Sequence, residues 1–373
     1  MEGDLFPPLK RSTVLAFQCS SWYDTFAPIT IKSTIIRPLP EDFREYLESD
    51  GVTIPEGAED TAAAESSLSD SDDSNANDDA NDDVGSDDSS TPQKVFTFPE
   101  LDATIRATIV KYGGAVFPKL NWTAPKDASW ILAPSTPLKC TSPADVYLYL
   151  KSSDFAAHDL DPEMVFDGCV DDPRTTTPLE DPGYVLELVL KKWYALDQSR
   201  EVRCFVRDDF LLGMCQRDSN FYEFLNETET QNTIQAGATS LWSDKIKGKF
   251  TGSNSYVVDL LLTRSMESAH IIDFNPYAPR TDPLLFDYQE LHALYLKAKG
   301  LQDASQHFQP EVRVITSASH PRAVRNAPIH QHNMVPREAL ELSQGRDIEG
   351  FRESLAEEIK KAMEPHSSAD APL

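Results

Sequence analysis

The amino-acid sequence predicts an α+β fold. Short apolar runs bounded by turn residues indicate strands, and they alternate with segments in which apolar residues recur every three or four positions, as in an amphipathic helix. The chain has 373 residues, of which 40% are hydrophobic, and this provides enough apolar material for a sizeable buried core. The run 257–276 also contains two apolar strands joined by a turn, the pattern of a β-hairpin.

The N-terminal part of the domain, residues 13–55, is expected to contain two strands and a helix. The apolar runs 13–17 and 30–39 each indicate a strand, and residues 40–47 indicate a short helix.

A change of composition follows. Residues 56–92 contain 13 acidic residues and no Lys or Arg, so this segment supplies 13 of the 27 net negative charges. Because it has almost no large apolar side chains, it cannot bury enough surface to offset the entropy cost of ordering. We predict a disordered acidic loop.

Helix and strand patterns resume in the segment 93–300. A helix is expected over 98–112, where apolar residues recur at helical spacing up to Gly113 and Gly114, which end it. A strand at 115–122 and a helix at 143–151 follow.

Further strands are expected at 184–194, 201–206 and 210–217, the last two joined as a hairpin, followed by helices at 231–249 and 290–300.

The end of the chain is expected to form a linker, 301–336, and an amphipathic tail helix, 337–364. The apolar positions of this helix lie on one face, and they are Ile348, Phe351, Leu355, Ile359 and Met363. This stripe fits packing on the chain's own domain as well as docking of a partner.

The composition excludes several classes of protein. The net charge of −27 repels nucleic-acid phosphates. The five cysteines are scattered without a C-x-x-C pair, which argues against zinc or disulfide scaffolds and for reduced thiols. There is no run of 18 apolar residues and no signal-peptide pattern, so we expect a cytoplasmic protein that does not contact membranes. We also expect a monomer.

The predicted hairpin at 257–276 carries a candidate magnesium clamp. Strand alternation places Asp273 and Asn275 on one face, and the hairpin brings Asp259 beside them. Three oxygen ligands with room for phosphate oxygens suit Mg²⁺. The alternative is that these residues only form turns and end strands.

Basic residues provide candidate phosphate ligands. Lys119 ends a predicted strand and is followed by a polar loop containing Lys126, although both lysines could simply be solvated. Arg203 and Arg217 lie among apolar strand residues and need partners, which a phosphate would satisfy. Carboxylates such as Glu201 or Asp218 would satisfy them equally, and one sequence leaves both options open.

Several long strings resemble the cell division cycle protein 123 family, also called the D123 family. They occur in the family's order and cover nearly the whole ordered chain. The strings are SSWYDTFAPITIKSTIIRPLP, VFPKLNWTAPKDASWI, LKCTSPADVYLYLKSSDF, ELVLKKW, EVRCFVRDDFLLGMCQRD and HIIDFNPYAPRTDPLLF.

The resemblance implies an ATP-grasp-like fold in which two subdomains hold Mg·ATP. Asp259, Asp273 and Asn275 would hold magnesium. The residues implied to contact the nucleotide include these three together with Lys119, Asn121, Trp122, Ala124, Lys126, Asp127, the hinge residues Leu190, Lys191, Lys192, Trp193 and Tyr194, and Glu201, Arg203, Arg217 and Asp218.

The resemblance also implies a partner and a function. The family's role is that of an assembly chaperone that binds the gamma subunit of eukaryotic translation initiation factor 2 and promotes formation of the heterotrimer, supporting translation initiation and cell-cycle progression. The alternative is an ATP-grasp carboxylate–amine ligase. ATP-grasp ligases commonly have an acidic residue in the hinge, where this chain has Lys191 and Lys192, so the chaperone is preferred.

Overall fold

The computed structural model describes residues 4–59, 94–132, 136–170, 184–303 and 308–325. The chain divides into two compact units, one formed by residues 1–218 and 224–314 and the other by 219–223 and 315–373. Both sheets and the candidate site belong to the first unit. In the described part of the second unit, the one helix is α10 (Pro321–Arg325).

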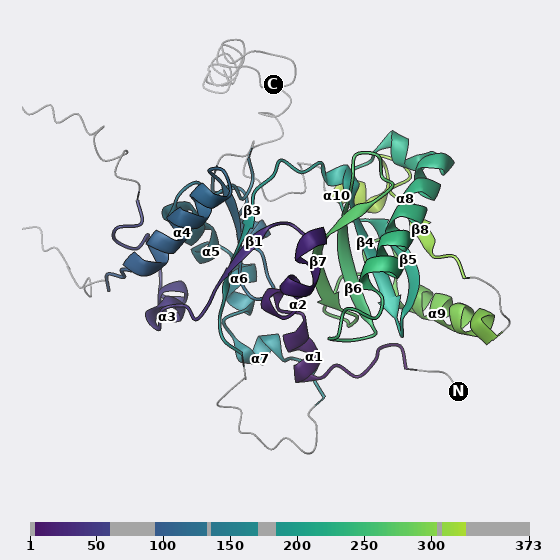
Figure 1. Ribbon diagram of the computed structural model, residues 1–373, viewed down its shortest axis with the longest axis horizontal. Helices are drawn as coiled ribbons and strands as arrows, with labels where there is room; N and C mark the ends of the chain where they lie inside the picture. Colours follow the sequence, from purple (N-terminus) through teal and green to yellow (C-terminus); the bar gives the residue numbers. More distant parts are fainter. Residues whose placement is uncertain (1–3, 60–93, 133–135, 171–183, 304–307, 326–373) are drawn as a thin grey trace, which may run out of the picture. The chain divides into compact units, whose positions relative to one another are not determined.

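A three-stranded antiparallel sheet occupies one side of the first unit, in the order β1-β3-β2 (Figure 1). Its strands are β1 (Ser33–Ile36), β2 (Val116–Lys119) and β3 (Leu188–Lys192). Side chains of neighbouring strand residues point to opposite faces. Leu188 and Leu190 of the central strand therefore pack into a core cluster on one face, while Lys191 is directed to the other.

Three helices cover the apolar face of this small sheet. They are α3 (Asp42–Glu48), α4 (Pro99–Lys111) and α5 (Pro143–Lys151), and their buried residues share one cluster with Leu188 and Leu190. Local sequence explains their bounds. Helix α4 begins with a proline and ends before Gly113, whose φ of +83° suits glycine, and α5 begins with a capping box formed by Ser142 and Asp145.

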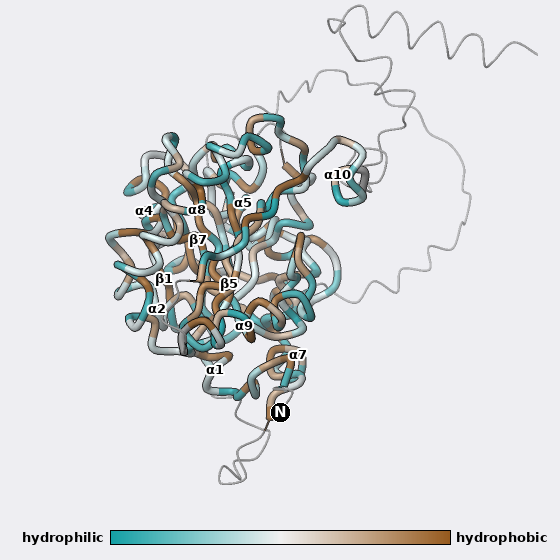
Figure 2. Tube along the Cα trace, turned by 90° about the vertical axis from the view of Figure 1, so that its right-hand side faces the viewer, coloured by the Kyte–Doolittle hydropathy of each residue, from teal (hydrophilic) through white to brown (hydrophobic). Residues whose placement is uncertain are grey.

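A five-stranded sheet forms the other part of the unit, in the order β7-β6-β4-β5-β8. Its strands are β4 (Glu201–Arg207), β5 (Phe210–Gln216), β6 (Tyr256–Leu262), β7 (Ala269–Pro276) and β8 (Glu311–Arg313). Neighbours are antiparallel except that β8 runs parallel to β5. In Figure 2, brown hydrophobic segments follow the strands around the labels of β5 and β7.

Helices cover both faces of the large sheet. Helix α9 (Tyr288–Asp303) packs through Leu291, Tyr295 and Ala298 against a cluster that includes Phe205 and Val257. Helix α8 (Thr228–Leu241) lies on the opposite face, where Ile234 shares a small cavity with Val202 and Met214. Phe205 and Val202 are an odd number of residues apart on β4, as this two-sided packing requires.

The α+β prediction is confirmed, and so are the two predicted hairpins. The turn between β4 and β5 contains Asp208 and Asp209, whose φ values of 47° and 60° are in the left-handed region, which short acidic side chains tolerate better than most others.

Two predictions about elements are wrong, and a third element has different bounds. Residues 13–17 lie mostly in helix α1 (Arg11–Ala16), where the amide of Val14 donates to the carbonyl of Lys10. A short apolar run fits either a strand or a helix, and its neighbours decide which forms. The helix expected at 231–249 begins at Thr228, ends at Leu241 and continues as a π-turn, Trp242–Ile246. The segment predicted as a linker contributes β8 to the large sheet.

The start of the predicted acidic loop also differs. The amide of Glu56 donates to the carbonyl of Phe96 at 2.9 Å, and Ala58 is fully buried, so residues 56–59 belong to the packed domain. Residues 60–92 and the predicted tail helix lie outside the described residues. Within the part of the chain that the structure describes, no helix has the length and apolar character needed to cross a membrane.

Candidate functional site

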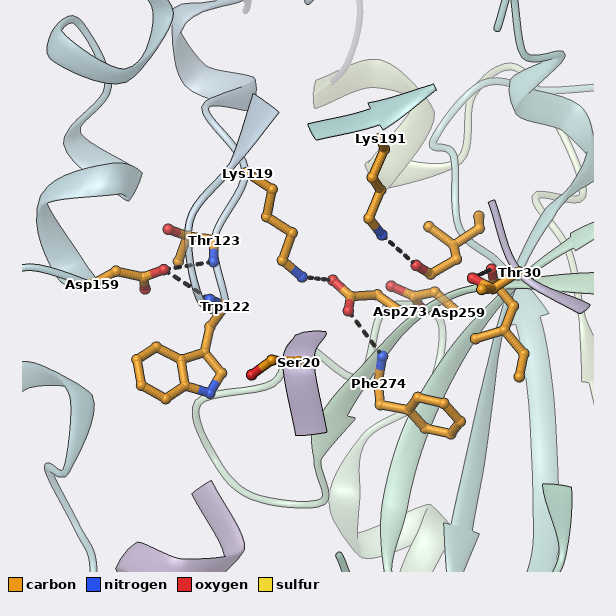
Figure 3. Close-up of polar contacts among 12 residues, drawn as sticks. Ser20, Thr30, Lys119, Trp122, Thr123, Asp159, Lys191, Asp259, Asp273 and Phe274 are labelled. Atoms are coloured by element: carbon orange, nitrogen blue, oxygen red, sulfur yellow. Dashed lines mark hydrogen bonds and ion pairs between the residues drawn. The ribbon is translucent and has the colours of Figure 1, made fainter. Parts of the chain in front are cut away.

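Two lysines of the small sheet reach across to β7 of the large sheet (Figure 3). Lys119, at the end of β2, forms an ion pair with Asp273, and Lys191 donates a hydrogen bond of 2.7 Å to the carbonyl of Ile272. Both lysines come from the face of the small sheet opposite its helices, and they are only 2% and 4% exposed. The interior cations thus bind the two sheets to each other.

A β-bulge in β7 makes this arrangement possible. Asp259 of β6 pairs directly with Asp273, while the next pair joins Leu260 to Ile271, so Ile272 is left outside the ladder. An unpaired bulge residue has a free carbonyl, and this carbonyl accepts the hydrogen bond that Lys191 donates.

Two arginines surround Asp259. Arg203 on β4 donates to both carboxylate oxygens of Asp259 at 2.7 and 2.9 Å, and Arg217, just after β5, donates to one of them at 3.0 Å and to Glu201 at 2.8 Å. The alternative in which carboxylates satisfy the arginines is therefore confirmed, with Asp259 as an additional partner that the sequence did not suggest.

Burial and neighbouring charges act on the pKa values of these groups in opposite directions. Burial alone would raise the pKa of Asp259, but Arg203 and Arg217 hold it well below its usual range. Burial alone would lower the pKa of Lys119, but Asp273 outweighs it and the pKa is raised. For Lys191 burial prevails over the attraction of Asp273, and the pKa is lowered.

Lys126 differs from the other cations of the site. It lies in the loop after β2, at the start of a single 3-10 turn, Lys126–Ala128. Its side chain keeps an exposed surface, yet protein atoms crowd its ammonium group. This desolvation and the charge of Arg217 lower the pKa to about 8. Among the described residues, no side chain or carbonyl pairs with this ammonium group.

We refer to eight of these residues as the charged cluster. Its members are Lys119, Lys126, Lys191, Arg203, Arg217, Glu201, Asp259 and Asp273. Five cations against three carboxylates leave an excess of two positive charges. An anion with several charges would balance this excess.

Two further buried carboxylates interact electrostatically with Lys119. Asp159 accepts hydrogen bonds from two backbone amides and contacts His158. Glu187 accepts one from the amide of Ser20 and lies 3.9 Å from Arg37. Burial raises the pKa of Glu187. The sequence contained no signal for either residue, because an isolated acidic residue carries no spacing pattern.

The remaining predicted site residues are distributed around the cluster. Leu190 is buried in β3, and Trp193 donates from its indole nitrogen to the carbonyl of Pro137. Lys192 lies over the exposed ring of Tyr194. Asn121 is fully buried and joins the loop to β3 through the amide of Glu187.

Three members of the predicted phosphate loop have other partners. The indole of Trp122 donates to the carbonyl of Val14 at 3.0 Å, Asp127 accepts from Ser153 and Phe155, and the carbonyl of Ala124 accepts from the amide of Lys126. Asp218 is the second residue after β5 and follows Arg217 in the chain.

The predicted magnesium ligands lie close together and have oxygen donors, which are two of the requirements of a Mg²⁺ site. Asp259 and Asp273 are directly paired across the hairpin, and Asn275 follows on the same face of β7. Carboxylate and amide oxygens suit Mg²⁺. Each carboxylate already contacts a basic side chain, so a bare cation would meet a positive surrounding, whereas a cation that arrives with an anionic ligand would not. Within the described ranges, no cluster of three or more His, Cys, Asp or Glu side chains offers another metal site.

The fold and the cluster define an α+β protein whose two sheets meet at buried ion pairs. Residues 22–343 match the model of the D123 family. The chain belongs to the D123 family.

Its relatives include two yeast proteins named translation initiation factor eIF2 assembly protein. That of Kluyveromyces lactis is 35% identical over the whole of both chains, and that of Schizosaccharomyces pombe is 34% identical over 95% of this chain and 99% of the relative. A solved structure of Cdc123 from Schizosaccharomyces pombe aligns with a TM-score of 0.59 and 33% identity, covering 83% of this chain and all of the other.

Proposed function

We propose that this protein binds Mg·ATP in the charged cluster and acts as an assembly chaperone for eukaryotic translation initiation factor 2, through that factor's gamma subunit. The observation that carries the nucleotide part is the excess of two positive charges on the side chains of the cluster, of which Lys119, Lys191 and Arg203 are buried and Lys126 is exposed. The names of the relatives support the choice of client. An ATP-grasp-like relationship between the two sheets is part of the same proposal.

The residues have separate roles in this proposal. Lys119, Lys126 and Arg203 bind and neutralise phosphate oxygens, since cations that lie in desolvated surroundings attract an anion strongly. Asp259, Asp273 and Asn275 would hold magnesium, which would supply positive charge to the phosphate. Residues 190–192 of β3, together with Trp193 and Tyr194 directly after it, border the adenine. The nucleotide would link the two sheets at the same place where Lys119 and Asp273 now meet.

Isothermal titration with ATP, with and without Mg²⁺, tests the site. We expect binding that requires magnesium, and at least about tenfold weaker binding by Asp273→Asn, which loses one charge in a desolvated site. Asp42→Asn is the matched control, because Asp42 is exposed on α3. Wild-type affinity in Asp273→Asn would show that the site is wrongly assigned.

A second experiment tests the client and the type of activity. The purified chain is mixed with the gamma subunit, and assembly of the heterotrimer is followed with and without ATP while released phosphate is measured. We expect a complex with the gamma subunit and faster assembly with little phosphate release. Steady phosphate release accompanied by a new amide bond would instead support the ligase, and failure to bind the gamma subunit would refute the chaperone.

A further inference from the structure

The loop that carries Lys126 is held by one short helix. This loop, residues 120–128, connects β2 to the 3-10 turn, and its backbone folds back on itself where the amide of Leu120 donates to the carbonyl of Thr123. Helix α6 (Asp154–His158) lies against it. The residues that flank α6, Ser153 before it and Asp159 after it, make the side-chain contacts with the loop.

The first contact involves Asp159, which is fully buried. Its Oδ2 accepts hydrogen bonds from the consecutive amides of Trp122 and Thr123 at 2.8 and 2.9 Å, as Figure 3 shows. Hydrogen bonds to a charged acceptor are about twice as strong as neutral ones. The other oxygen, Oδ1, lies 3.1 Å from Nδ1 of His158, and the carbonyl of Asp159 accepts from Tyr184.

The second contact lies at the other end of the loop. Asp127 accepts from the hydroxyl of Ser153 at 2.5 Å and from the amide of Phe155 at 3.2 Å. The same hydroxyl caps α6 by accepting from the amide of Ala156. The loop is therefore fastened to both ends of one helix, by one carboxylate of the helix segment and one of its own.

Between these two attachment points lies the one cation of the charged cluster that has no partner among the described residues. The ammonium group of Lys126 is acted on by Arg217, Glu201, Asp259 and Arg203, so it lies close to them without pairing. A long side chain that is repelled by two arginines would turn toward solvent if its backbone were free to move. The backbone on either side of Lys126 is fixed, so the point from which its side chain extends is fixed relative to the cluster.

We infer that α6 is a positioning element for ligand binding: Asp159 and Asp127 fix the backbone of residues 120–128 so that Lys126 is presented to a polyphosphate in the charged cluster. This inference rests on the proposed function. A loop ordered before binding loses less entropy when the ligand arrives, which raises affinity. Asp159 touches no ligand in this account, and its effect through the loop is distinct from its charge interaction with Lys119.

The test compares Asp159→Asn with Asp161→Asn in the full chain. Asp161 is a matched control, because it also accepts a backbone amide, that of Glu163, but contacts α7 (Pro162–Val165) and not the loop. Hydrogen exchange of the ligand-free proteins should be faster over residues 122–128 in Asp159→Asn only. The affinity for ATP with magnesium should fall about tenfold in Asp159→Asn, the effect of one lost charge-assisted hydrogen bond, and stay unchanged in the control.

A merely structural role is excluded by repeating the substitution in Lys126→Met. If Asp159 acts by presenting Lys126, Asp159→Asn should lower affinity by less than about twofold in that background, because coupled residues are not additive. An equal loss in both backgrounds would overturn the inference, and so would unchanged exchange of the loop in Asp159→Asn. Failure of the wild-type chain to bind ATP would refute the proposed function instead, and the exchange measurement on ligand-free protein would still decide whether α6 holds the loop.

Discussion

At the scale of single residues, the site depends on ionised groups that are buried and share partners. Asp259 is 2% exposed and is held by two guanidinium groups. Removing one member of such a network leaves the others charged and unpaired in the interior, which is far more costly than replacing the whole network. Substitutions here therefore change stability as well as ligand binding, and the two effects have to be measured separately.

The substitution Asp259→Ala illustrates this. It leaves Arg203 and the Nε–H of Arg217 without their carboxylate acceptor. We expect the free energy of unfolding to fall by about 3–5 kcal/mol. Asp259→Asn keeps an oxygen acceptor and should lose less. Urea denaturation measures both. Equal stability of wild type and Asp259→Ala would mean that the arginines find other partners.

A second residue-scale prediction concerns pH. The pKa of Lys126 is lowered to about 8, and a phosphate binds the protonated form. Affinity for ATP should reach its maximum below pH 7 and fall as the pH rises through 8. At pH 9, where roughly one tenth of the lysine is protonated, affinity should be up to about tenfold weaker. Arginine stays charged throughout, so Lys126→Arg should remove this dependence. A titration series in both proteins checks it, and parallel pH profiles would contradict the role of Lys126.

At the scale of elements, the sequence predicted most strands and helices and the strand pairs of the two hairpins, but not the pairings between strands that are distant in the chain. The helical form of residues 11–16 could not be predicted, because the four apolar residues 14–17 are too few to show a period. The short strand β8 was missed because it is formed by pairing with β5. Asp273 and Asp259 were predicted as neighbours from the hairpin, whereas their ion pairs with Lys119 and the arginines depend on tertiary contacts.

Two helical glycines offer a prediction about elements. A Cβ atom at Gly237 in α8 would lie 2.6 Å from the carbonyl oxygen of Met266, whereas one at Gly300 in α9 would meet nothing within 4 Å. Replacing glycine by alanine inside a helix normally stabilises by about 1 kcal/mol. Gly300→Ala should therefore raise the melting temperature and Gly237→Ala should lower it, because α8 must move away from the β6–β7 turn. Calorimetry of both variants tests this, and a rise in both would rule out the clash.

At the scale of the whole molecule, the acidic segment is expected to be separate from the site. Glu56 and Ala58 pack with the domain, so a deletion has to begin after Glu59 and end before Lys94, with a short Gly-Ser linker in its place. We expect ATP affinity within about twofold of wild type at physiological salt, since charges beyond a Debye length of about 8 Å are screened. Titration at two salt concentrations checks this. A large loss at both would assign the segment a direct part in binding.

The ion pair between Lys119 and Asp273 joins residues that are 154 positions apart, and this has a consequence for synthesis of the chain. Lys119 emerges from the ribosome long before β7 has been synthesised, so an unfinished chain contains only part of the site. In the proposed function, a nascent chain could not retain ATP until the hairpin β6–β7 has emerged and docked against the small sheet. Nucleotide binding would then distinguish chains in which both sheets have formed from shorter ones, and only the former would engage a client.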